Sequence, residues 1–300
     1  MNKKQNLNII YPNIDEIGLT KNLFGFNALG EKIELPVVTE KPMTIYLNSN
    51  EIVTAMTLGD WPKEMAVGFL YNQNFIKTLN EIETIDYDDD LSVVVVRTKK
   101  HTNYEIKLKK QIRTSGCAQG TIYADIMDKF KTISLNKSIR ITTNQLFSLS
   151  KKINEVPSLY LKAGAIHGCV LCNINNPLIF MEDIGRHNAV DKISGYMFLN
   201  KISGYDKVFY TTGRLTTEMI IKTVMMKIPI LVSRSGFTEA GVELARKSGL
   251  TLIGRAKGKR LIVLSGKERV IFEDFDRNLY SKDVEETASA QREIQGDKRI

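Results

Sequence analysis

Residues 207–234, "KVFYTTGRLTTEMIIKTVMMKIPILVSR", decide the fold class of this chain. A short apolar run, "KVFYTT", leads into the helix-like segment "TTEMIIKTVMMK", and a second apolar run, "PILVSR", follows it. The same order recurs downstream, where "TEAGVELARKSG" is followed by "LTLIGRA" and then by "RLIVL". Strands that alternate with helices of about a dozen residues predict a layered α/β domain with a largely parallel sheet.

The segment upstream of this stretch continues the pattern. "KAGAIHGCVLCNI" and "LIFMEDI" are typical of two strands joined by an Asn-Asn-Pro turn, and "NAVDKISGYMFLNK" is typical of a helix. Two further helices are expected over residues 121–132 and 143–156, with Thr143 as the N-cap of the second. These elements belong to the same α/β domain.

The first part of the chain has a different, strand-rich character. "MTIYLNSNEIVTAMTL" predicts a hairpin, "TIDYDDDLSVVVVRT" and "NYEIKLKK" predict two more strands, and a helix is expected with Asp60 as its cap and Pro62 in its first turn. We therefore divide the chain into an N-terminal strand-rich subdomain over residues 1–112, an α/β domain over 113–278 and a polar, frayed tail over 279–300.

Composition limits the function. Hydrophobic residues make up 43% of the chain and charged residues 25%, as in ordinary soluble proteins. The N-terminus lacks the apolar core of a signal peptide and no apolar run approaches the roughly 18 residues of a membrane span, so we expect a cytoplasmic protein with no membrane partner. The net charge of +8 favours an anionic partner, but no zinc-finger spacing or RNP-like strand points to nucleic acid.

Cys117 is a candidate nucleophile. It lies in "IRTSGCAQGTIY", between Gly116 and Gly120 and about four residues before the expected helix. The positive potential of a helix N-terminus stabilises a thiolate, and small neighbours leave the sulfur accessible. The alternative is a small residue that fills a turn.

The other two cysteines, Cys169 and Cys172, form a C-x-x-C pair with His167 just upstream. This resembles the zinc ligands of cytidine deaminases, but the H-x-E element that supplies the proton-shuttling Glu is missing. Residues three apart in a strand also point to opposite faces. Buried small residues are the better interpretation, and no zinc is expected.

The stretch "EDIGRHNAVDK" is a candidate ligand site, because ligands bind outside the carboxyl ends of parallel strands. Its polar residues crowd the junction between a strand and a helix: Glu182, Asp183, Arg186, His187, Asn188, Asp191 and Lys192. The alternative is local capping by Asp183 or Asn188, with Asp191 paired to a base.

Two more loops share this geometry. In "TTGRLTTEM", Gly213 turns the chain after a strand, and the backbone N–H groups of the next helix could hold a phosphate beside Arg214. "SRSGFTEAG" repeats the arrangement. Finally, "GRAKGKR" carries four basic residues in a turn between strands, which is either a solvated hairpin or a clamp on a pyrophosphate: Arg255, Lys257, Lys259 and Arg260.

With these residues in place, the chain resembles the FdhD family, the formate dehydrogenase accessory sulfurtransferases. The resemblance runs from about Asn48 to Leu264 and rests on "TLGDWPKEMAVGFLYNQNFI", "RTSGC", "EDIGRHNAVDKISG", "TTGRLTTEMIIK" and "SGLTLIGRAKGKR". It implies a three-layer α/β/α fold of the cytidine-deaminase type without its zinc site, usually dimeric.

The resemblance also implies a role in sulfur transfer. A cysteine desulfurase would hand sulfur to the loop cysteine as a persulfide, and the protein would pass it to the molybdenum of bis(molybdopterin guanine dinucleotide) bound for formate dehydrogenase. Cys117 takes the place of the persulfide cysteine. Apart from the resemblance, the residues themselves offer His187 or Arg186 as the cation that would stabilise its thiolate. The cofactor-binding stretch corresponds to Arg255, Ala256, Lys257, Gly258, Lys259 and Arg260. We also expect cofactor contacts from Arg186, His187, Asn188, Gly213 and Arg214.

This chain departs from the family pattern at two positions. The loop lacks the second cysteine of the family's C-x-x-C, since Gly120 stands there, and Arg255 replaces an aromatic residue in the basic stretch. One thiol is enough to accept sulfur, so transfer by Cys117 is still expected. Two other functions stay open: a chaperone that binds the molybdenum cofactor without covalent chemistry, and a zinc-dependent deaminase.

Overall fold

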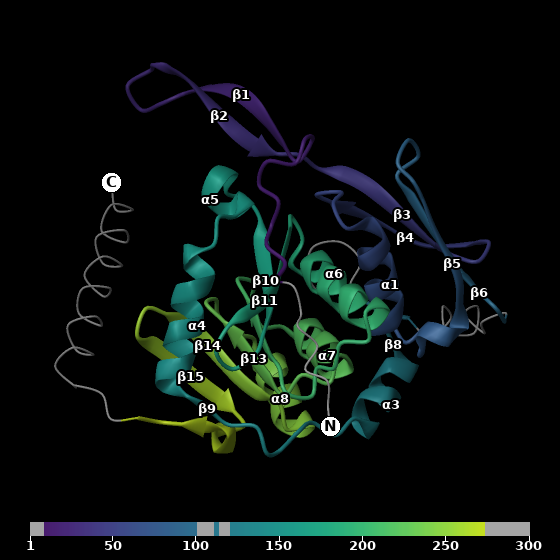
Figure 1. Ribbon diagram of the computed structural model, residues 1–300, viewed down its shortest axis with the longest axis vertical. Coiled ribbons are helices and arrows are strands. Elements are labelled where there is room, and N and C mark those ends of the chain that lie inside the picture. Colours follow the sequence, from purple (N-terminus) through teal and green to yellow (C-terminus); the bar gives the residue numbers. More distant parts are fainter. Residues whose placement is uncertain (1–8, 101–110, 114–120, 274–300) are drawn as a thin grey trace.

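The computed structural model describes residues 9–100, 111–113 and 121–273 (Figure 1). Its centre is a six-stranded sheet with the order β11-β10-β12-β13-β14-β15. The strands are β10 (His167–Cys172), β11 (Pro177–Asp183), β12 (Val208–Thr211), β13 (Ile230–Ser233), β14 (Thr251–Lys257) and β15 (Arg260–Ser265). Strands β11, β12, β13 and β14 run in one direction, while β10 and β15 run against them. The sheet is therefore mixed, and the prediction of a largely parallel sheet is wrong.

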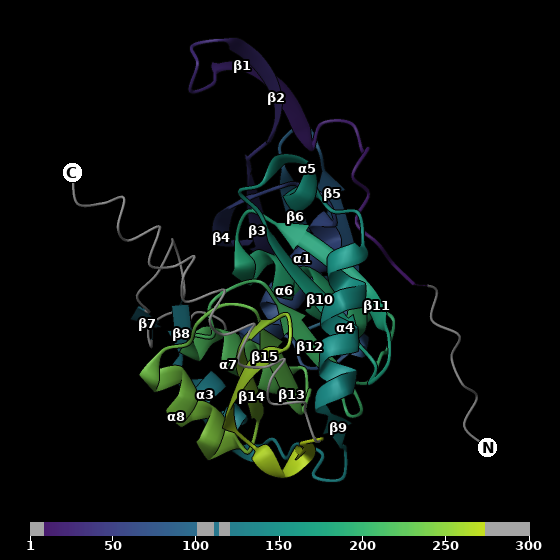
Figure 2. The ribbon, with the colours of Figure 1, turned by 90° about the vertical axis from the view of Figure 1, so that its left-hand side faces the viewer.

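Helices cover both faces of this sheet, which confirms the α/β/α architecture. On one face lies α4 (Thr143–Glu155), and on the other lie α6 (Arg186–Leu199), α7 (Thr217–Met225) and α8 (Glu239–Ser248), as Figure 2 shows. Alternating residues of β10 separate the two cores: Val170 packs in the cluster that includes Leu146 of α4, whereas Leu171 packs in the cluster that includes Val190 of α6.

The N-terminal half packs on the outer side of α6. Its four-stranded sheet has the order β4-β3-β6-β5, and α1 lies between this sheet and α6. The elements are β3 (Lys41–Leu47), β4 (Asn50–Thr57), α1 (Pro62–Asn72), a 3-10 turn (Leu79–Glu81), β5 (Ile82–Asp88) and β6 (Val93–Thr98). One buried apolar cluster runs from Ile45 of β3 through Val67 of α1 to Ile193 of α6. The boundaries drawn at residues 112 and 278 stay predictions.

A hairpin of β1 (Thr20–Phe26) and β2 (Lys32–Val38) extends away from this body, and Figures 1 and 2 show it from two sides. Its base is held where Leu19 and Val38 pack against Leu159 of the short helix α5 (Leu159–Ala163). The other elements are β7 (Gln111–Arg113), β8 (Thr121–Tyr123), α3 (Ala124–Thr132), β9 (Ile141–Thr142), a 3-10 turn (Lys267–Arg269) and β16 (Val270–Ile271).

Local boundaries differ from the sequence prediction at three places. Helix α4 is capped by Thr142 rather than Thr143, in a capping box with Gln145. Asp60 does not cap α1, whose N-cap residue is Trp61. Helix α3 begins three residues later than predicted because residues 121–123 form β8, so the helix start lies farther from Cys117 than expected.

Two predictions about the N-terminal strands have different outcomes. "TIDYDDDLSVVVVRT" forms the two strands of the β5–β6 hairpin rather than one strand, because its Asp-rich centre makes the turn. "NYEIKLKK" lies outside the described residues. No helix in the described part of the chain is long and apolar enough to cross a membrane.

Candidate functional site

Four strands end at the same edge of the six-stranded sheet. Thr211 at the end of β12 pairs with Ser233 at the end of β13, and Asp183 at the end of β11 pairs with His167 at the start of the antiparallel β10. The last residue of β14, Lys257, comes from the strand beyond β13. The three strand-end loops and the basic turn therefore lie along one edge, as the strand-helix alternation predicts.

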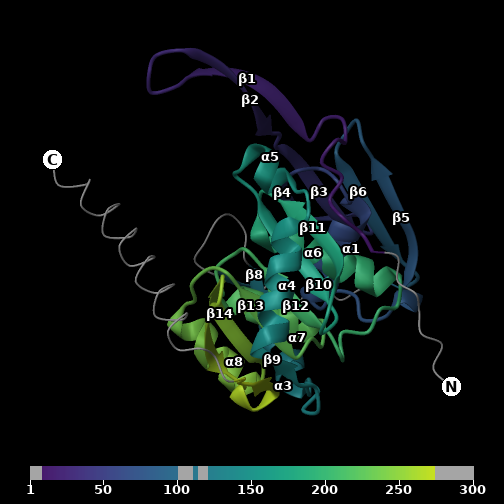
Figure 3. The same cartoon turned by 60° about the vertical axis from the view of Figure 1, so that its left-hand side comes forward.

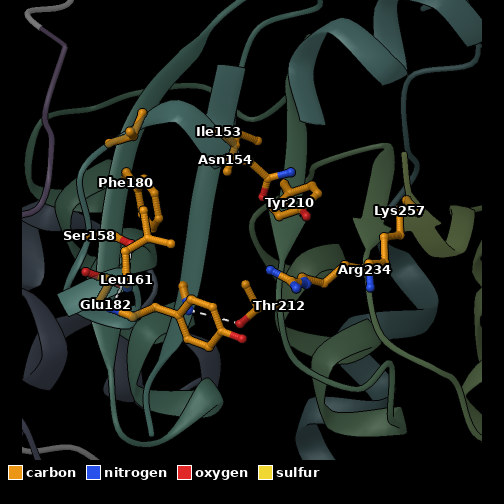
Figure 4. Close-up of a pocket in the computed structure, with 14 residues that line it drawn as sticks. Ile153, Asn154, Ser158, Leu161, Phe180, Glu182, Tyr210, Thr212, Arg234 and Lys257 are labelled. Carbon is orange, nitrogen blue, oxygen red and sulfur yellow. Dashed lines mark hydrogen bonds between the residues drawn. The ribbon is translucent and has the colours of Figure 1, made fainter. Parts of the chain in front are cut away.

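A cavity of about 250 Å³ opens at this edge, on the side of the sheet that α4 covers (Figure 4). Its wall includes Tyr160 and Leu161 of α5, Thr212 from the first loop, Arg234 from the second and Lys257 from the basic turn. Figure 4 shows the side chains of Arg234 and Lys257 on the side of the cavity opposite Leu161. The cavity thus combines an apolar wall with two cations.

The cations of this edge carry uncompensated charge. In the described part of the chain, no carboxylate lies within ion-pair distance of the six cations of this edge, which are Arg214, Arg234, Arg255, Lys257, Lys259 and Arg260. The guanidinium of Arg234 lies 5.5 Å from the ring of Tyr160, a cation–π arrangement that holds it beside the cavity. The edge is therefore suited to an anionic ligand.

Arg255 occupies an unusual backbone position. Its φ of 53° lies in the left-handed region, where residues other than Gly are uncommon. Its backbone N–H donates to the carbonyl of Ser235 at 2.9 Å, and its guanidinium lies 5.6 Å from the ring of Phe237. The side chain is exposed, so Arg255 is fixed at its base while its charge stays available to a ligand.

Most side chains of the "EDIGRHNAVDK" cluster are buried and bond to other groups in the protein interior. Asp183 is fully buried and accepts hydrogen bonds from the backbone N–H of Leu58 and the amide of Asn188, and Lys192 Nζ lies 2.5 Å from one of its oxygens. The Asn188 amide also donates to the carbonyl of Met56 at 2.8 Å. The predicted cofactor contact from Asn188 stays a prediction, because the bonds described for its amide go to Asp183 and to Met56 of the N-terminal half.

The alternative of local capping holds only in part for this cluster. The N-cap residue of α6 is Gly185, not Asp183 or Asn188, although its backbone N–H donates to the carboxylate of Asp183 at 3.0 Å. The carboxylate of Glu182 instead accepts the backbone N–H groups of Leu159 and Tyr160 at the start of α5. Asp191 does pair with a base as that alternative proposed, since Lys222 Nζ lies 2.6 Å from its carboxylate. The cluster is a buried polar network that joins α6 to its neighbours.

His187 and Arg186 lie on the α6–α7 side of the edge. His187 Nε2 is 3.2 Å from a carboxylate oxygen of Glu218, and burial lowers the pKa of His187 to about 2 while it raises the pKa of Glu218. His187 is therefore neutral at physiological pH and is not the cation expected to stabilise a thiolate. Arg186 is 7% exposed and packs against Gly213, where a Cβ atom would lie 2.8 Å from Arg186 Cδ.

Two residues of the edge, His167 and Tyr160, were not predicted from the sequence as part of this site. His167 faces the strand-end loop through a 3.3 Å contact between its Nδ1 and Thr212 Oγ1, and burial, Arg186 and Arg214 lower its pKa. The sequence suggested His167 only as a zinc ligand, because its place at the edge depends on β10 running antiparallel. Tyr160 was missed because the five-residue helix α5 gives no clear periodic signal.

The structure describes two of the three cysteines, Cys169 and Cys172. Cys117 lies outside the described residues. Cys169 and Cys172 are fully buried and belong to the two separate cores on opposite faces of the sheet, so they cannot bind one metal ion together. Burial raises the pKa of both thiols, that of Cys169 to about 12, which leaves them protonated.

The fold and the site define an α/β protein with a cationic edge at the carboxyl ends of its strands. The family model described as the FdhD/NarQ family matches residues 38–271. The chain therefore belongs to the FdhD/NarQ family.

Similar proteins carry consistent names. A sulfur carrier protein FdhD from Listeria monocytogenes is 30% identical over 80% of this chain and 93% of its own length. The protein of the same name from Bacillus subtilis is 29% identical over 80% of this chain and 92% of its own length. A crystal structure of a candidate formate dehydrogenase accessory protein from Desulfotalea psychrophila matches with a TM-score of 0.68 and 28% identity, over 84% of this chain and 98% of that one.

Proposed function

We propose that this protein is a sulfur carrier that accepts persulfide sulfur on Cys117 from a cysteine desulfurase. It then transfers the sulfur to the molybdenum of bis(molybdopterin guanine dinucleotide), the cofactor of formate dehydrogenase. The proposal is supported by membership of the FdhD/NarQ family and by the names of the relatives. We place the protein in the cytoplasm, where the desulfurase and the acceptor enzyme would meet it.

The observation that carries the proposal is the cationic edge beside the cavity. A dinucleotide cofactor presents two kinds of group, phosphates and planar bases. The unpaired charges of Arg234, Arg255 and Lys257 suit the phosphates, and the ring of Tyr160 offers a planar base a surface on which to stack. A cavity of about 250 Å³ is small for an entire ligand of this class, so we assign it to one end of the dinucleotide.

The first chemical step transfers one sulfur atom from the persulfide of the desulfurase to Cys117. The Cys117 thiolate attacks the outer sulfur of the desulfurase persulfide, an S–S bond forms on Cys117, and the original S–S bond breaks. The desulfurase cysteine leaves as a thiolate, so the step involves no net oxidation. The bound cofactor supplies the metal that finally accepts the sulfur.

Mass spectrometry tests this step. Incubation with a cysteine desulfurase, its pyridoxal phosphate and cysteine should add one sulfur atom to the peptide that contains Cys117. The peptide with Cys169 and Cys172 is an internal control: both thiols are buried and protonated, so it should stay unmodified in the folded protein. Sulfur distributed over all three cysteines, or absent from Cys117, would contradict the proposal.

The second candidate function is a chaperone that binds the cofactor without covalent chemistry. The single cysteine of the loop, with Gly120 in the second position, favours it. Complementation separates the two functions. Cys117→Ala should abolish formate dehydrogenase maturation if the protein carries sulfur, and should leave maturation intact if the protein only delivers the cofactor.

A further inference from the structure

The six-stranded sheet has a second cationic edge, where β12, β13 and β14 begin, which we call the amino edge. Figure 3 shows α3, α8 and β9 gathered at this end of the molecule, with α5 at the other end. Five segments meet here, at residues 133–140, 200–207, 226–230, 246–251 and 265–269. They contain two acidic residues and nine basic ones, which are Lys137, Arg140, Lys201, Lys207, Lys227, Arg246, Lys247, Lys267 and Arg269.

The two acidic residues of the amino edge already have partners. Asp206 pairs with Lys207, and Glu268 lies 3.6 Å from Arg269. Arg269 is buried and also donates to the carbonyl of Asn136 at 2.7 Å, which holds the segment 133–140 at this edge. In the described part of the chain, no carboxylate lies within ion-pair distance of the other seven cations, all of them exposed: Lys137, Arg140, Lys201, Lys227, Arg246, Lys247 and Lys267.

A cavity of about 250 Å³ opens at the amino edge, between the ends of α6 and α7. Lys201 and Lys227 line it together with three side chains that carry hydroxyl groups, Tyr71, Ser194 and Ser203. The cavity is smaller than the pockets that enclose drug-sized ligands, so it fits a single side chain of a partner better than a cofactor. Two cations and three hydroxyl groups are suited to a carboxylate.

Both lysines of this cavity are held in an unfavourable backbone conformation. Lys201 follows Asn200, the C-cap of α6, and Lys227 follows Met226, the C-cap of α7, and their φ angles are 54° and 58°. Glycine is the usual residue at this left-handed position. A cation at a helix C-terminus gains less from the helix dipole than the left-handed conformation costs. The dipole therefore does not account for the two lysines, whereas an anionic group bound in the cavity they share does.

The amino edge is also close to the residues that flank Cys117 in the sequence. Arg113 of β7 pairs with Thr121 of β8, and α3 begins directly after β8. Helix α3 has nine residues, a length of about 13 Å, and the segment 133–140 follows it at the amino edge. A protein that covers the amino edge and α3 would therefore reach the β7–β8 pair. The opposite edge carries the cavity that we assign to the cofactor, so the enzyme that receives the cofactor must approach from there.

We propose that the amino edge is the docking surface for the cysteine desulfurase, and that it contacts an acidic surface of that enzyme with one carboxylate in the cavity between Lys201 and Lys227. The identity of the partner rests on the proposed function, while the surface itself rests on its charge and its cavity. Seven exposed cations would steer an acidic protein to this end of the molecule and fix its orientation. Because the two edges are separate, the sulfur donor and the cofactor can be bound at the same time.

Binding of the purified desulfurase to the full chain, measured by biolayer interferometry, tests the docking surface. Lys201→Gly/Lys227→Gly removes both charges and places glycine where the backbone favours it, so this variant should fold about as stably as the wild type. Its affinity for the desulfurase should fall about tenfold or more at low salt, and the difference should shrink as the salt concentration rises. Lys63→Ala/Lys99→Ala removes two exposed lysines from the N-terminal half and should bind like the wild type.

Sulfur loading separates a failure of this surface from a failure of the proposed function. At low desulfurase concentration the glycine variant should load Cys117 more slowly than the wild type, and saturating desulfurase should restore the full rate. A wild type that takes up no sulfur on Cys117 would overturn the proposed function. Normal loading of the wild type, with equal desulfurase affinity in the glycine and control variants, would overturn the docking surface alone. A glycine variant that keeps its desulfurase affinity but loses affinity for formate dehydrogenase, or for an oligonucleotide, would assign the amino edge to that ligand and also overturn the proposal.

Discussion

Lys192 shows how the polar cluster on α6 joins the two halves of the molecule. Its side chain is completely buried, and its Nζ lies 2.5 Å from carboxylate oxygens of both Asp60 and Asp183. Burial lowers the pKa of Lys192, but the carboxylates of Asp183 and Asp60 outweigh this effect and hold the pKa above its ordinary value. Such a pair adds little net stability over an apolar contact, yet it fixes one arrangement of the elements it joins.

Removing this cation should be strongly destabilising. Lys192→Met leaves Asp183 buried without its counter-ion, and we expect the free energy of unfolding to fall by about 3–5 kcal/mol. Denaturant unfolding measures the loss. Lys131→Met, which breaks an exposed pair on α3 with Asp128, is the matched control and should cost less than about 0.5 kcal/mol. A similar, small loss for both variants would show that the Lys192 pair is not needed.

His187 should make the stability of the protein depend on pH. In the folded protein its pKa is about 2, so below pH 6.5 the unfolded chain binds a proton that the folded chain does not. Stability is therefore complete above pH 6.5 and falls as the pH decreases, by about 1 kcal/mol from His187 between pH 7 and 5.5. His187→Gln should reduce this fall by that amount in unfolding curves measured across the range. An unchanged pH dependence would mean that His187 is protonated in the folded state.

At the scale of elements, the crossing of α1 and α6 brings the two halves into contact. A Cβ atom at Gly68 would lie 1.8 Å from the carbonyl oxygen of Asp191, and one at Gly195 would lie 1.8 Å from that of Glu64. The neighbouring atoms are backbone, which cannot move aside without separating the helices. The two glycines therefore set the distance between α1 and α6.

Either glycine should resist substitution. Gly68→Ala or Gly195→Ala forces the helices apart, and we expect a loss of about 3 kcal/mol or more, seen as a lower melting temperature. Gly236→Ala is the control, because a Cβ atom there meets nothing within 4 Å. If the alanine variants at the crossing had the same melting temperature as the control, the two helices would separate at little cost in free energy.

The strands and helices of the α/β domain could be read from the sequence because their apolar periodicity reflects burial in each element. The place of β10 between β11 and β12 could not, because β12, unlike β11, is distant from β10 in the sequence. For the same reason the candidate site was predicted only in part. The strand-end loops and the basic turn have local signals, whereas the role of Asp183 depends on Leu58, 125 residues away.

At the scale of the whole molecule, charge is distributed unevenly over the sheet. The interior carboxylates Asp183 and Asp191 are matched by Lys192 and Lys222, while the cations of the carboxyl edge have no acidic partner within the described residues. The cations of the edge therefore concentrate positive charge where the strand-end loops meet the cavity. This focusing predicts that binding depends on the position of the charges and not only on their number.

Binding of guanosine diphosphate, the end group of the proposed cofactor, tests this prediction. Arg255→Ala/Lys257→Ala removes two cations of the edge, and calorimetry should show the affinity falling about tenfold or more, equivalent to about 1.4 kcal/mol, with a weaker dependence on salt. Lys131→Ala/Lys247→Ala removes the same number of charges from α3 and from the far end of α8, and should leave the affinity nearly unchanged. Equal losses in the two variants would mean that the ligand responds to net charge alone. A loss confined to the edge variant would place the phosphates at the basic turn, because two distant lysines contribute to the net charge but cannot contact the ligand.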